Sequence, residues 1–258
     1  LRDLYKRQVV EMVHVATLYH DDVMDEADRR RGVESANSRW NNSVAILAGD
    51  ALLAHASRLM SELDTHTVGH FGDTFEELVT GQMRETIGAG EANAVEHYTA
   101  VIREKTAVLI ASAGYLGAYH SGAPAEHAAA LYRIGGAIGM IFQIVDDVID
   151  IFSDPKDSGK TPGTDLREGV FTLPVLYALE EEGEVGDKLR EFLTGPLHSD
   201  AEVERAIELL RQSGGRDKAL KDINAYLRTV EEQLAVLPEN AASQALRQLA
   251  DYTVRRVG

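Results

Sequence analysis

Two Asp-Asp-x-x-Asp motifs carry the chemistry that this sequence could do. Their members are Asp21, Asp22 and Asp25 in the first and Asp146, Asp147 and Asp150 in the second. On a helix, residues i and i+4 share a face, so the first and last aspartate of each motif stack one turn apart. Such pairs offer oxygen ligands to hard cations such as Mg²⁺, which takes a few carboxylates together with substrate phosphates.

Each motif ends a segment that is apolar nearly all round, at residues 9–18 and 137–145. A helix that is apolar on every side belongs in the centre of a bundle. Close carboxylates at the end of such a helix repel one another and cost desolvation energy unless they hold a metal or become neutral. One motif alone could be a solvated helix end, but two copies on the most hydrophobic helices favour a metal and phosphate site.

Basic residues near both motifs could bind phosphate. Arg30 and Arg31 follow the first motif, Lys160 follows the second, and Lys105 stands where a long apolar run begins. Arginine grips phosphate oxygens with two parallel hydrogen bonds, so two adjacent arginines can serve two phosphate groups. Any one of these cations could instead be a solvated surface charge, and for Lys105 alone that is the better interpretation.

The elements that position these residues are predicted to be helices throughout. Ala, Leu, Glu, Arg and Gln dominate, and apolar residues recur at spacings of three and four. Gly and Pro punctuate the gaps. We predict an all-α helical bundle in one domain, 1–258, with helices near residues 3–24, 43–63, 66–87, 94–121, 124–152, 171–182, 185–194, 200–213, 215–236 and 239–256.

Composition excludes several function classes. Lys and Arg number 26 and Asp and Glu 42, giving a formal net charge of −16, which disfavours a nucleic-acid partner. An acidic protein that handles a polyanionic substrate needs cations as mediators. The chain has no cysteine, which excludes a zinc–thiolate site or a cysteine nucleophile. We expect neither a signal peptide nor a membrane span, and a cytoplasmic location as the default.

From about residue 11 to residue 176 the sequence resembles the trans-isoprenyl diphosphate synthases, or polyprenyl synthetases. The segments that carry the resemblance, in order, are LYHDDVMDEADRRRG, ILAGD, REKTAVLIASAGYLGA, GAIGMIFQIVDDVIDI and GKTPGTDLREGVFTLPVL. The resemblance implies an all-helical isoprenoid-synthase fold with a central cavity. It also implies a homodimer and about three Mg²⁺ ions per active site, with Mn²⁺ as a substitute.

The resemblance implies a role for each candidate residue. Asp21, Asp25, Asp146 and Asp150 are then metal ligands, with Asp22 and Asp147 supporting catalysis. Arg30 contacts the allylic diphosphate and Arg31 the isopentenyl diphosphate. Lys105 and Lys160 bind the allylic diphosphate, while Thr106 and Gln143 face the carbocation and the departing diphosphate. Cations preorganised around a leaving diphosphate stabilise the charge that develops on it.

The implied substrates are isopentenyl diphosphate and an allylic diphosphate with a dimethylallyl, geranyl, farnesyl or geranylgeranyl chain. The sequence departs from the family pattern in three places. The helices that precede the first motif in the family, with a basic segment for isopentenyl diphosphate, are expected to be missing. Val170 replaces a usual lysine, so one phosphate contact is expected to be missing, and Ala51 replaces a usual aromatic residue, which is expected to widen the interior.

Other functions are also compatible with parts of this sequence. A class I terpene cyclase shares the fold but usually replaces the second Asp motif and lacks an Arg-Arg-Gly of this kind. A non-catalytic subunit of a heteromeric synthase typically loses aspartates, whereas both motifs are intact here. An all-helical metal-dependent nucleotide pyrophosphohydrolase also sets acidic pairs on helices. Separately, His20-Asp21 could be the His-Asp ligand pair of a metal phosphohydrolase, but the doubled motif and Arg30-Arg31-Gly32 fit that interpretation poorly.

Product length is the finest feature that the sequence predicts. If the growing chain descends along the first Asp-motif helix, it meets side chains one and two turns upstream of Asp21. Family members with short products commonly place an aromatic side chain there, whereas this chain has Ala16 and Thr17, then Val13. We therefore expect a product longer than about twenty carbons unless Ala16 merely packs against a neighbouring helix, or Tyr115 or Tyr119 forms a floor.

Overall fold

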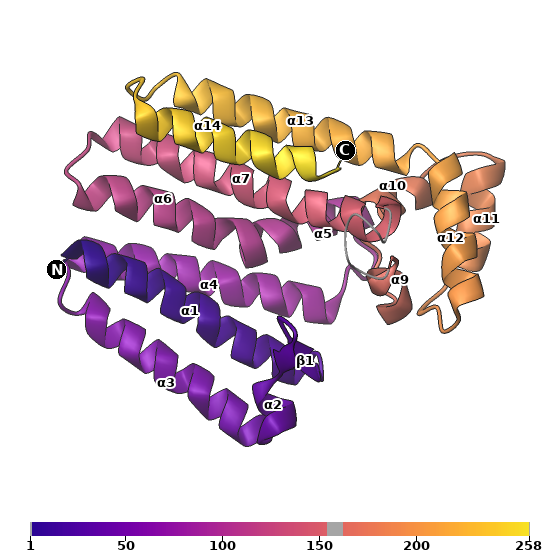
Figure 1. Cartoon of the computed structure of the whole chain (residues 1–258), viewed down its shortest axis with the longest axis horizontal. Coiled ribbons are helices and arrows are strands. Elements are labelled where there is room, and N and C mark those ends of the chain that lie inside the picture. Colours follow the sequence, from indigo (N-terminus) through magenta and orange to yellow (C-terminus); the bar gives the residue numbers. More distant parts are fainter. Residues whose placement is uncertain (1, 154–161, 258) are drawn as a thin grey trace. The chain divides into compact units, whose positions relative to one another are not determined.

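The structure is a computed structural model that describes residues 2–153 and 162–257. Within this part of the chain, helices form nearly everything (Figure 1). Backbone contacts divide the chain into two compact units. Unit 1 holds the residues up to Phe75 together with Ser112–Ala128, and unit 2 holds Glu76–Ala111 together with the described residues from Ala129 onward.

Unit 1 is built on two long helices that lie side by side, α1 (Arg2–Met24) and α3 (Asn42–Met60) (Figure 1). Between them come a hairpin of β1 (Arg29–Arg30) and β2 (Val33–Glu34), and the short α2 (Ala36–Arg39). The hairpin turn is Arg31-Gly32, with φ of 51° and 83°. A type I′ hairpin turn has positive φ at both central residues, a conformation that glycine adopts freely and arginine does not.

Unit 2 is built around α7 (Ala125–Phe152), whose interior residues form its main core. The other helices that this unit contains or shares are α4 (Thr65–Ile87), α5 (Ala94–Ile102), α6 (Val108–His120), α9 (Thr164–Glu168), α10 (Leu173–Leu179), α11 (Glu184–Phe192), α12 (Asp200–Gln212), α13 (Gly215–Leu234) and α14 (Ala241–Val254). A π-helical turn, η1 (Arg103–Ala107), joins α5 to α6, and a 3₁₀ turn, η2 (Arg255–Val257), follows α14.

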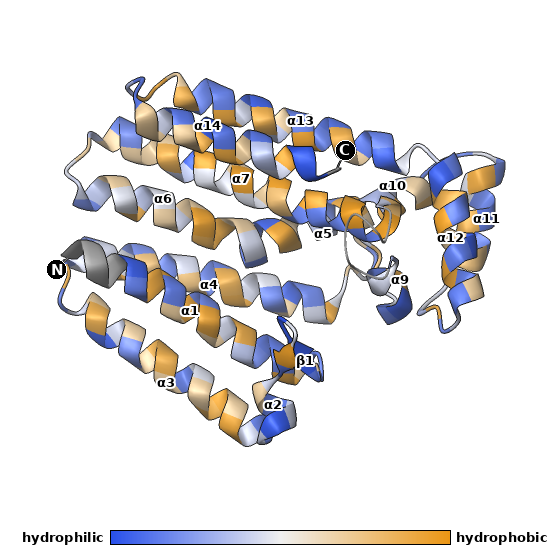
Figure 2. Cartoon of the chain, in the orientation of Figure 1, coloured by the Kyte–Doolittle hydropathy of each residue, from blue (hydrophilic) through white to orange (hydrophobic). Residues whose placement is uncertain are grey.

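The core of unit 2 explains why α7 is apolar nearly all round. Ile141, Ile144 and Val145 are at most 1% exposed and pack in one cluster with residues of α13 and α14 such as Ile223 and Ala250. A second cluster fills the space among α10, α11 and α12. Figure 2 shows the alternation of polar and apolar residues along α12, α13 and α14, as expected for helices with one buried face.

Helix α7 approaches α6 and η1 closely because two of its glycines carry no side chain. A Cβ atom on Gly135 would lie 2.5 Å from the carbonyl oxygen of Ile110, and one on Gly139 would lie 2.6 Å from Cα of Ala107. A Cβ on the neighbouring Gly136 would meet nothing closer than 3.8 Å. The bare backbone at positions 135 and 139 therefore sets how near α7 can come to the turn that carries Lys105.

The prediction of an all-α fold is confirmed, and the ten predicted helices are all found with boundaries shifted by a few residues. Sequence patterning missed the hairpin, α2, α9 and the π-turn that interrupts the helix predicted at 94–121. Each of these is shorter than two helical turns, so it leaves no periodic pattern to recognise. The single domain 1–258 stays a prediction.

Within the described residues, α3 and α7 are each long and apolar enough to cross a membrane by length and composition. The most apolar window of α7 is 61% buried, as expected for a core helix, whereas that of α3 is 17% buried. Helix α3 therefore presents an apolar surface that its own chain leaves largely uncovered.

Candidate active site

The first acidic cluster, Asp21, Asp22 and Asp25, lies at the end of α1. Asp22 is 3% exposed, and the Arg30 guanidinium neutralises it: Nε and Nη2 of Arg30 lie 2.7 and 2.5 Å from the same carboxylate oxygen. Asp25 is exposed just beyond α1, and its backbone N–H donates to the carbonyl of Asp21 at 2.8 Å. The one-turn spacing predicted for Asp21 and Asp25 is therefore kept beyond the helix end.

The two predicted phosphate-binding arginines are presented by the hairpin. Arg31 is exposed at the hairpin turn, while Arg30 is half-buried in its contact with Asp22. Arg29 stabilises the turn by donating from Nη2 to the carbonyl of Gly32 at 2.8 Å. One arginine thus neutralises an aspartate of the cluster and the next projects from the turn, and their contacts with substrate stay predictions.

His20, next to the first cluster, belongs to the packing of α1 on α3. Its Nε2 lies 3.2 Å from the carbonyl oxygen of Ile46 and 3.4 Å from the Asp50 carboxylate. A Cβ on Gly49 would lie 2.2 Å from the same nitrogen, so the glycine of the ILAGD segment makes room for the ring. These contacts account for His20 without the metal-ligand role of a phosphohydrolase.

The second acidic cluster, Asp146, Asp147 and Asp150, lies on the last turns of α7 and is mostly buried. Asp147 is 2% exposed and Asp150 8%. The Asp147 carboxylate accepts a short hydrogen bond from the Tyr98 hydroxyl and a 3.2 Å bond from Nε2 of Gln143. Burial of a carboxylate with only neutral donors leaves its charge uncompensated.

The other two carboxylates have different partners. Asp150 accepts backbone N–H bonds from Thr164 and Asp165, at 3.2 and 3.3 Å, at the start of α9. Asp146 is one-third exposed and pairs with Nη2 of Arg256 at 3.2 Å. The Arg256 guanidinium also stands over the Phe142 ring, 5.7 Å from its centroid.

Burial raises the pKa of Asp147 from its ordinary value of 3.8 to about 7, although the bonds from Tyr98 and Gln143 act in the opposite direction. Burial, followed by the charges of Asp150 and Asp147, likewise raises the pKa of Asp165 to about 7. Four carboxylates of unit 2 are thus close enough to repel one another. A multivalent cation would relieve this repulsion, and oxygen-only donors suit Mg²⁺ or Ca²⁺.

Lys105 and Thr106 both lie in the π-turn η1. Nζ of Lys105 lies 2.5 Å from the Glu85 carboxylate of α4. The Thr106 hydroxyl donates to Oε1 of Gln143 at 3.3 Å, and Gln143 in turn donates to Asp147. The predicted polar residues Thr106 and Gln143 therefore form one hydrogen-bonded chain with the second cluster. The predicted ligand Lys160 lies outside the described residues.

Four residues in contact with predicted site residues were missed from the sequence: Tyr98, Glu85, Asp165 and Arg256. Asp165 falls within a segment that carries the family resemblance, so its position next to the second motif could have suggested it. Tyr98, Glu85 and Arg256 lie far along the chain from their partners. Their type and spacing alone carry no signal.

The predicted chain-length residues share the buried face of α1. Ala16 and Val13 are 0% and 1% exposed, and Val9, one turn further from Asp21, is 2% exposed. Thr17 is half-buried, and its hydroxyl donates to the carbonyl of His14 at 2.8 Å, which satisfies it within its own helix. The contact of these residues with a growing chain stays a prediction.

Tyr115 and Tyr119, the alternative floor, belong to a cluster of rings between α4 and α6 in unit 1. The Tyr115 hydroxyl is hydrogen-bonded to Nε2 of His66 at 2.7 Å, and its ring stacks on His70 with centroids 4.4 Å apart. Tyr119 packs against His66 with centroids 4.6 Å apart. Both tyrosines are therefore held in place by imidazoles, and their contact with a growing chain stays a prediction.

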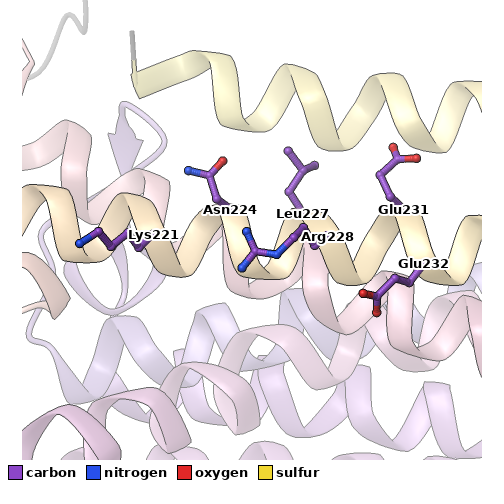
Figure 3. Close-up of a pocket in the computed structure, with 6 residues that line it drawn as sticks. All are labelled: Lys221, Asn224, Leu227, Arg228, Glu231 and Glu232. Atoms are coloured by element: carbon purple, nitrogen blue, oxygen red, sulfur yellow. The ribbon is translucent and has the colours of Figure 1, made fainter.

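Among the described residues, no group of three or more His, Cys, Asp or Glu side chains forms a ready-made metal cage. Figure 3 shows a groove elsewhere, on α13, lined by Lys221, Asn224, Leu227, Arg228, Glu231 and Glu232. None of the predicted site residues lines it.

Comparison with known proteins places these features in a family. The model of the polyprenyl synthetase family matches residues 4–210. The nonaprenyl diphosphate synthase of Mycobacterium tuberculosis is 53% identical over 251 residues, covering 97% of this chain and 75% of the relative.

Solved structures agree. A geranylgeranyl pyrophosphate synthase from Corynebacterium glutamicum, complexed with calcium and isoprenyl diphosphate, is 63% identical with a TM-score of 0.89, covering 97% of this chain and 76% of that one. A decaprenyl diphosphate synthase from Rhodobacter capsulatus is 34% identical with a TM-score of 0.89, covering 98% and 79%.

The fold and the two aspartate motifs define an all-α isoprenoid synthase. The chain belongs to the polyprenyl synthetase family, and the predicted family resemblance is confirmed.

The raised pKa values of Asp147 and Asp165 predict how stability depends on pH when a chelator removes divalent ions. A carboxyl whose folded pKa exceeds its unfolded value stabilises the protein below the unfolded pKa, and this contribution is lost as pH rises through the folded pKa. Between about pH 4 and 7, the interval from the unfolded to the folded pKa, the free energy of unfolding should therefore fall more steeply for the wild type than for Asp147→Asn.

Urea titrations at several pH values measure this slope. Asp217→Asn, at an exposed position of α13, is the control and should keep the wild-type slope. Equal slopes for the wild type and Asp147→Asn would contradict the raised pKa of Asp147.

Proposed function

We propose that this chain is a prenyltransferase that condenses isopentenyl diphosphate with an allylic diphosphate, head to tail and repeatedly, into a trans-polyprenyl diphosphate. The observation that carries the proposal is the buried second acidic cluster, linked through Gln143 to Thr106, in a chain of the polyprenyl synthetase family. The names of the relatives, which include nonaprenyl and decaprenyl diphosphate synthases, favour this function over a cyclase or a non-catalytic subunit.

In this proposal the chain's own residues supply metal ligands, positive charge and polar groups around the substrates. Asp21, Asp25, Asp146 and Asp150 supply oxygen ligands, while Arg31 and Lys105 supply positive charge to diphosphate oxygens. The hydroxyl of Thr106 and the amide of Gln143 face the allylic carbon as it becomes positive. The double bond of isopentenyl diphosphate attacks that carbon, and the proton then lost goes to the released diphosphate, so no protein base is needed.

The metal is proposed to be Mg²⁺, with about three ions per active site and Mn²⁺ as a substitute. When bound, it supplies charge stabilisation to the departing diphosphate. The calcium in the Corynebacterium structure supports a hard divalent ion. The repulsion among the carboxylates of unit 2 supports the same conclusion from this chain.

Chelation with EDTA should abolish turnover, and added Mg²⁺ should restore it. Asp21→Ala and Asp146→Ala should each lower kcat by about three orders of magnitude, because every ~1.4 kcal/mol of lost transition-state stabilisation costs tenfold. Incorporation of radiolabelled isopentenyl diphosphate measures turnover, and circular dichroism confirms the fold. Asp217→Ala is the control. Full turnover in EDTA, or in either aspartate variant, would contradict the assignment of the two clusters as metal ligands.

We propose a product longer than about twenty carbons, because the buried face of α1 carries only small side chains one turn above Asp21. The nonaprenyl and decaprenyl relatives support a long product, whereas the Corynebacterium relative is named for a twenty-carbon one. The experiment therefore has to measure product length directly.

Ala16→Phe should shorten the product to about fifteen or twenty carbons without abolishing turnover, because the added ring would project into the path along α1 that the growing chain is proposed to follow. Chromatography of the products after removal of the diphosphate gives their length. Glu11→Phe, which adds the same ring at an exposed position of α1, should leave the length unchanged. A wild-type product of fifteen carbons, or an unaltered length in Ala16→Phe, would refute the proposal.

We propose that the chain forms a homodimer through the uncovered face of α3. Val44, Ile46 and Leu47 are 41%, 42% and 65% exposed, and α3 buries only Ala45, Gly49 and Ala56 within its own chain (Figure 2). Exposed apolar side chains gathered on one helix mark a surface that another molecule can cover. A second copy is the partner that the family resemblance implies.

Sedimentation velocity at micromolar concentration should show a dimer for the wild type and a monomer for Leu47→Glu. The change places a charge on an apolar interface, where it lacks a partner. Leu249→Glu, at a half-exposed leucine of α14, is the control and should remain dimeric. A wild-type monomer that instead binds lipid vesicles through α3 would contradict the dimer.

We also propose a cytoplasmic location, with peripheral membrane contact during product release. A polyprenyl chain of the proposed length is apolar along its whole tail, so it partitions into lipid.

A further inference from the structure

The π-turn η1 is held between two helices of unit 2 by glycines that permit backbone contact. On α7, a Cβ at Gly139 would lie 2.6 Å from Cα of Ala107. On α4, a Cβ at Gly81 would lie 2.7 Å from the backbone nitrogen of Lys105 and 2.8 Å from Cβ of Glu104. The turn that carries Lys105 and Thr106 is therefore clamped on both sides by backbone, with no side chain between.

A π-turn has a specific consequence for side-chain direction. It inserts one extra residue into a helix, so the residues before and after it are rotated relative to each other by about 100° compared with a regular α-helix. Lys105 and Thr106 lie inside the insertion, and their directions depend on where it is placed. A shift of the insertion by one residue would send both side chains elsewhere.

An ion pair between Arg84 of α4 and Glu104 of the π-turn also holds the turn against the neighbouring helix. Nε and Nη2 of Arg84 reach the two carboxylate oxygens of Glu104 at 2.9 and 3.2 Å, a two-pronged contact. Arg84 follows Gly81 by one helical turn and adjoins Glu85, which holds Lys105. Glu104 is 18% exposed and immediately precedes Lys105. A two-pronged contact of this kind fixes the relative orientation of the guanidinium and the carboxylate as well as the distance between them.

We propose that Arg84 and Glu104 are positioning residues that set the register of the π-turn, and so the directions of Lys105 and Thr106 toward the allylic diphosphate. The inference rests on the proposed function for the identity of that ligand. Neither residue contacts substrate in this role. Arg84 acts on Glu104, and Glu104 acts on its two neighbours in the chain.

The chain offers a matched comparison for a purely structural ion pair. Nε of Arg247 on α14 lies 3.0 and 3.1 Å from the two carboxylate oxygens of Glu231 on α13, and the arginine side chains of both pairs are 40% exposed. The Arg247 pair joins two regular helices that carry no predicted site residue. Loss of either pair removes a similar contact, and only the Arg84 pair adjoins the π-turn.

The test compares Arg84→Gln, Glu104→Gln, their double variant and Arg247→Gln. Steady-state kinetics give kcat and KM for each substrate, and calorimetry gives the affinity for inorganic pyrophosphate with Mg²⁺. Arg84→Gln and Glu104→Gln should each raise the allylic KM and weaken pyrophosphate binding by about tenfold, within the range of one charge-assisted hydrogen bond. The double variant should be no worse than either single one, and the isopentenyl KM should stay unchanged.

Arg247→Gln should leave the kinetic constants and the pyrophosphate affinity at wild-type values. A lower melting temperature in Arg84→Gln, with both KM values and pyrophosphate affinity unaltered, would overturn the proposal, since it would show a structural contact alone. Additive losses in the double variant would overturn it as well. If the wild type fails to elongate an allylic diphosphate, the proposed function is wrong. The calorimetric affinities for inorganic pyrophosphate would still test whether Arg84 and Glu104 position Lys105 and Thr106.

Discussion

The constraint on which unit 2 depends is the burial of carboxylates at the end of α7, the helix that contributes most of its core. Asp147 and Asp150 stand almost out of solvent at the end of α7, where a free charge is costly. Tyr98, Gln143 and the first residues of α9 donate hydrogen bonds to them, and each donor comes from an element whose place is then fixed. A hydrophobic core explains why α7 is buried, but the carboxylates explain why α5 and α9 must come to its end.

The same constraint links stability to function. Burial raises the pKa of Asp147 and that of Asp165 to about 7, so these two carboxyl groups are poorly suited to being charged on their own. The same carboxyl groups are well suited to bind a hard cation, whose positive charge favours their ionised form. The burial of these carboxylates is thus costly to the isolated protein, and the binding of a cation would offset that cost.

Sequence reasoning recovered what periodicity and spacing encode. The long helices were found because apolar residues recur along them, and the two acidic clusters were found because three aspartates share one turn. The π-turn was missed because one extra residue barely disturbs a hydrophobic pattern, although it redirects Lys105 and Thr106. Tyr98 was missed because its role comes from a contact 49 residues away, which no local pattern records. The pairing of Arg30 with Asp22 was missed because the hairpin turn uses an arginine where glycine or asparagine is usual.

The two acidic clusters differ in how far along the chain their partners lie, and this difference suggests the order in which the clusters form during folding. Asp22 meets Arg30 across 8 residues, so the first cluster can neutralise its buried member as soon as the hairpin closes. Asp147 meets Tyr98 across 49 residues, and Asp146 meets Arg256 across 110. Because closing a longer loop costs more entropy, contacts of high sequence separation form late in folding. The polypeptide should therefore complete its first acidic cluster early and locally, while the second waits for the last helix of the chain to dock.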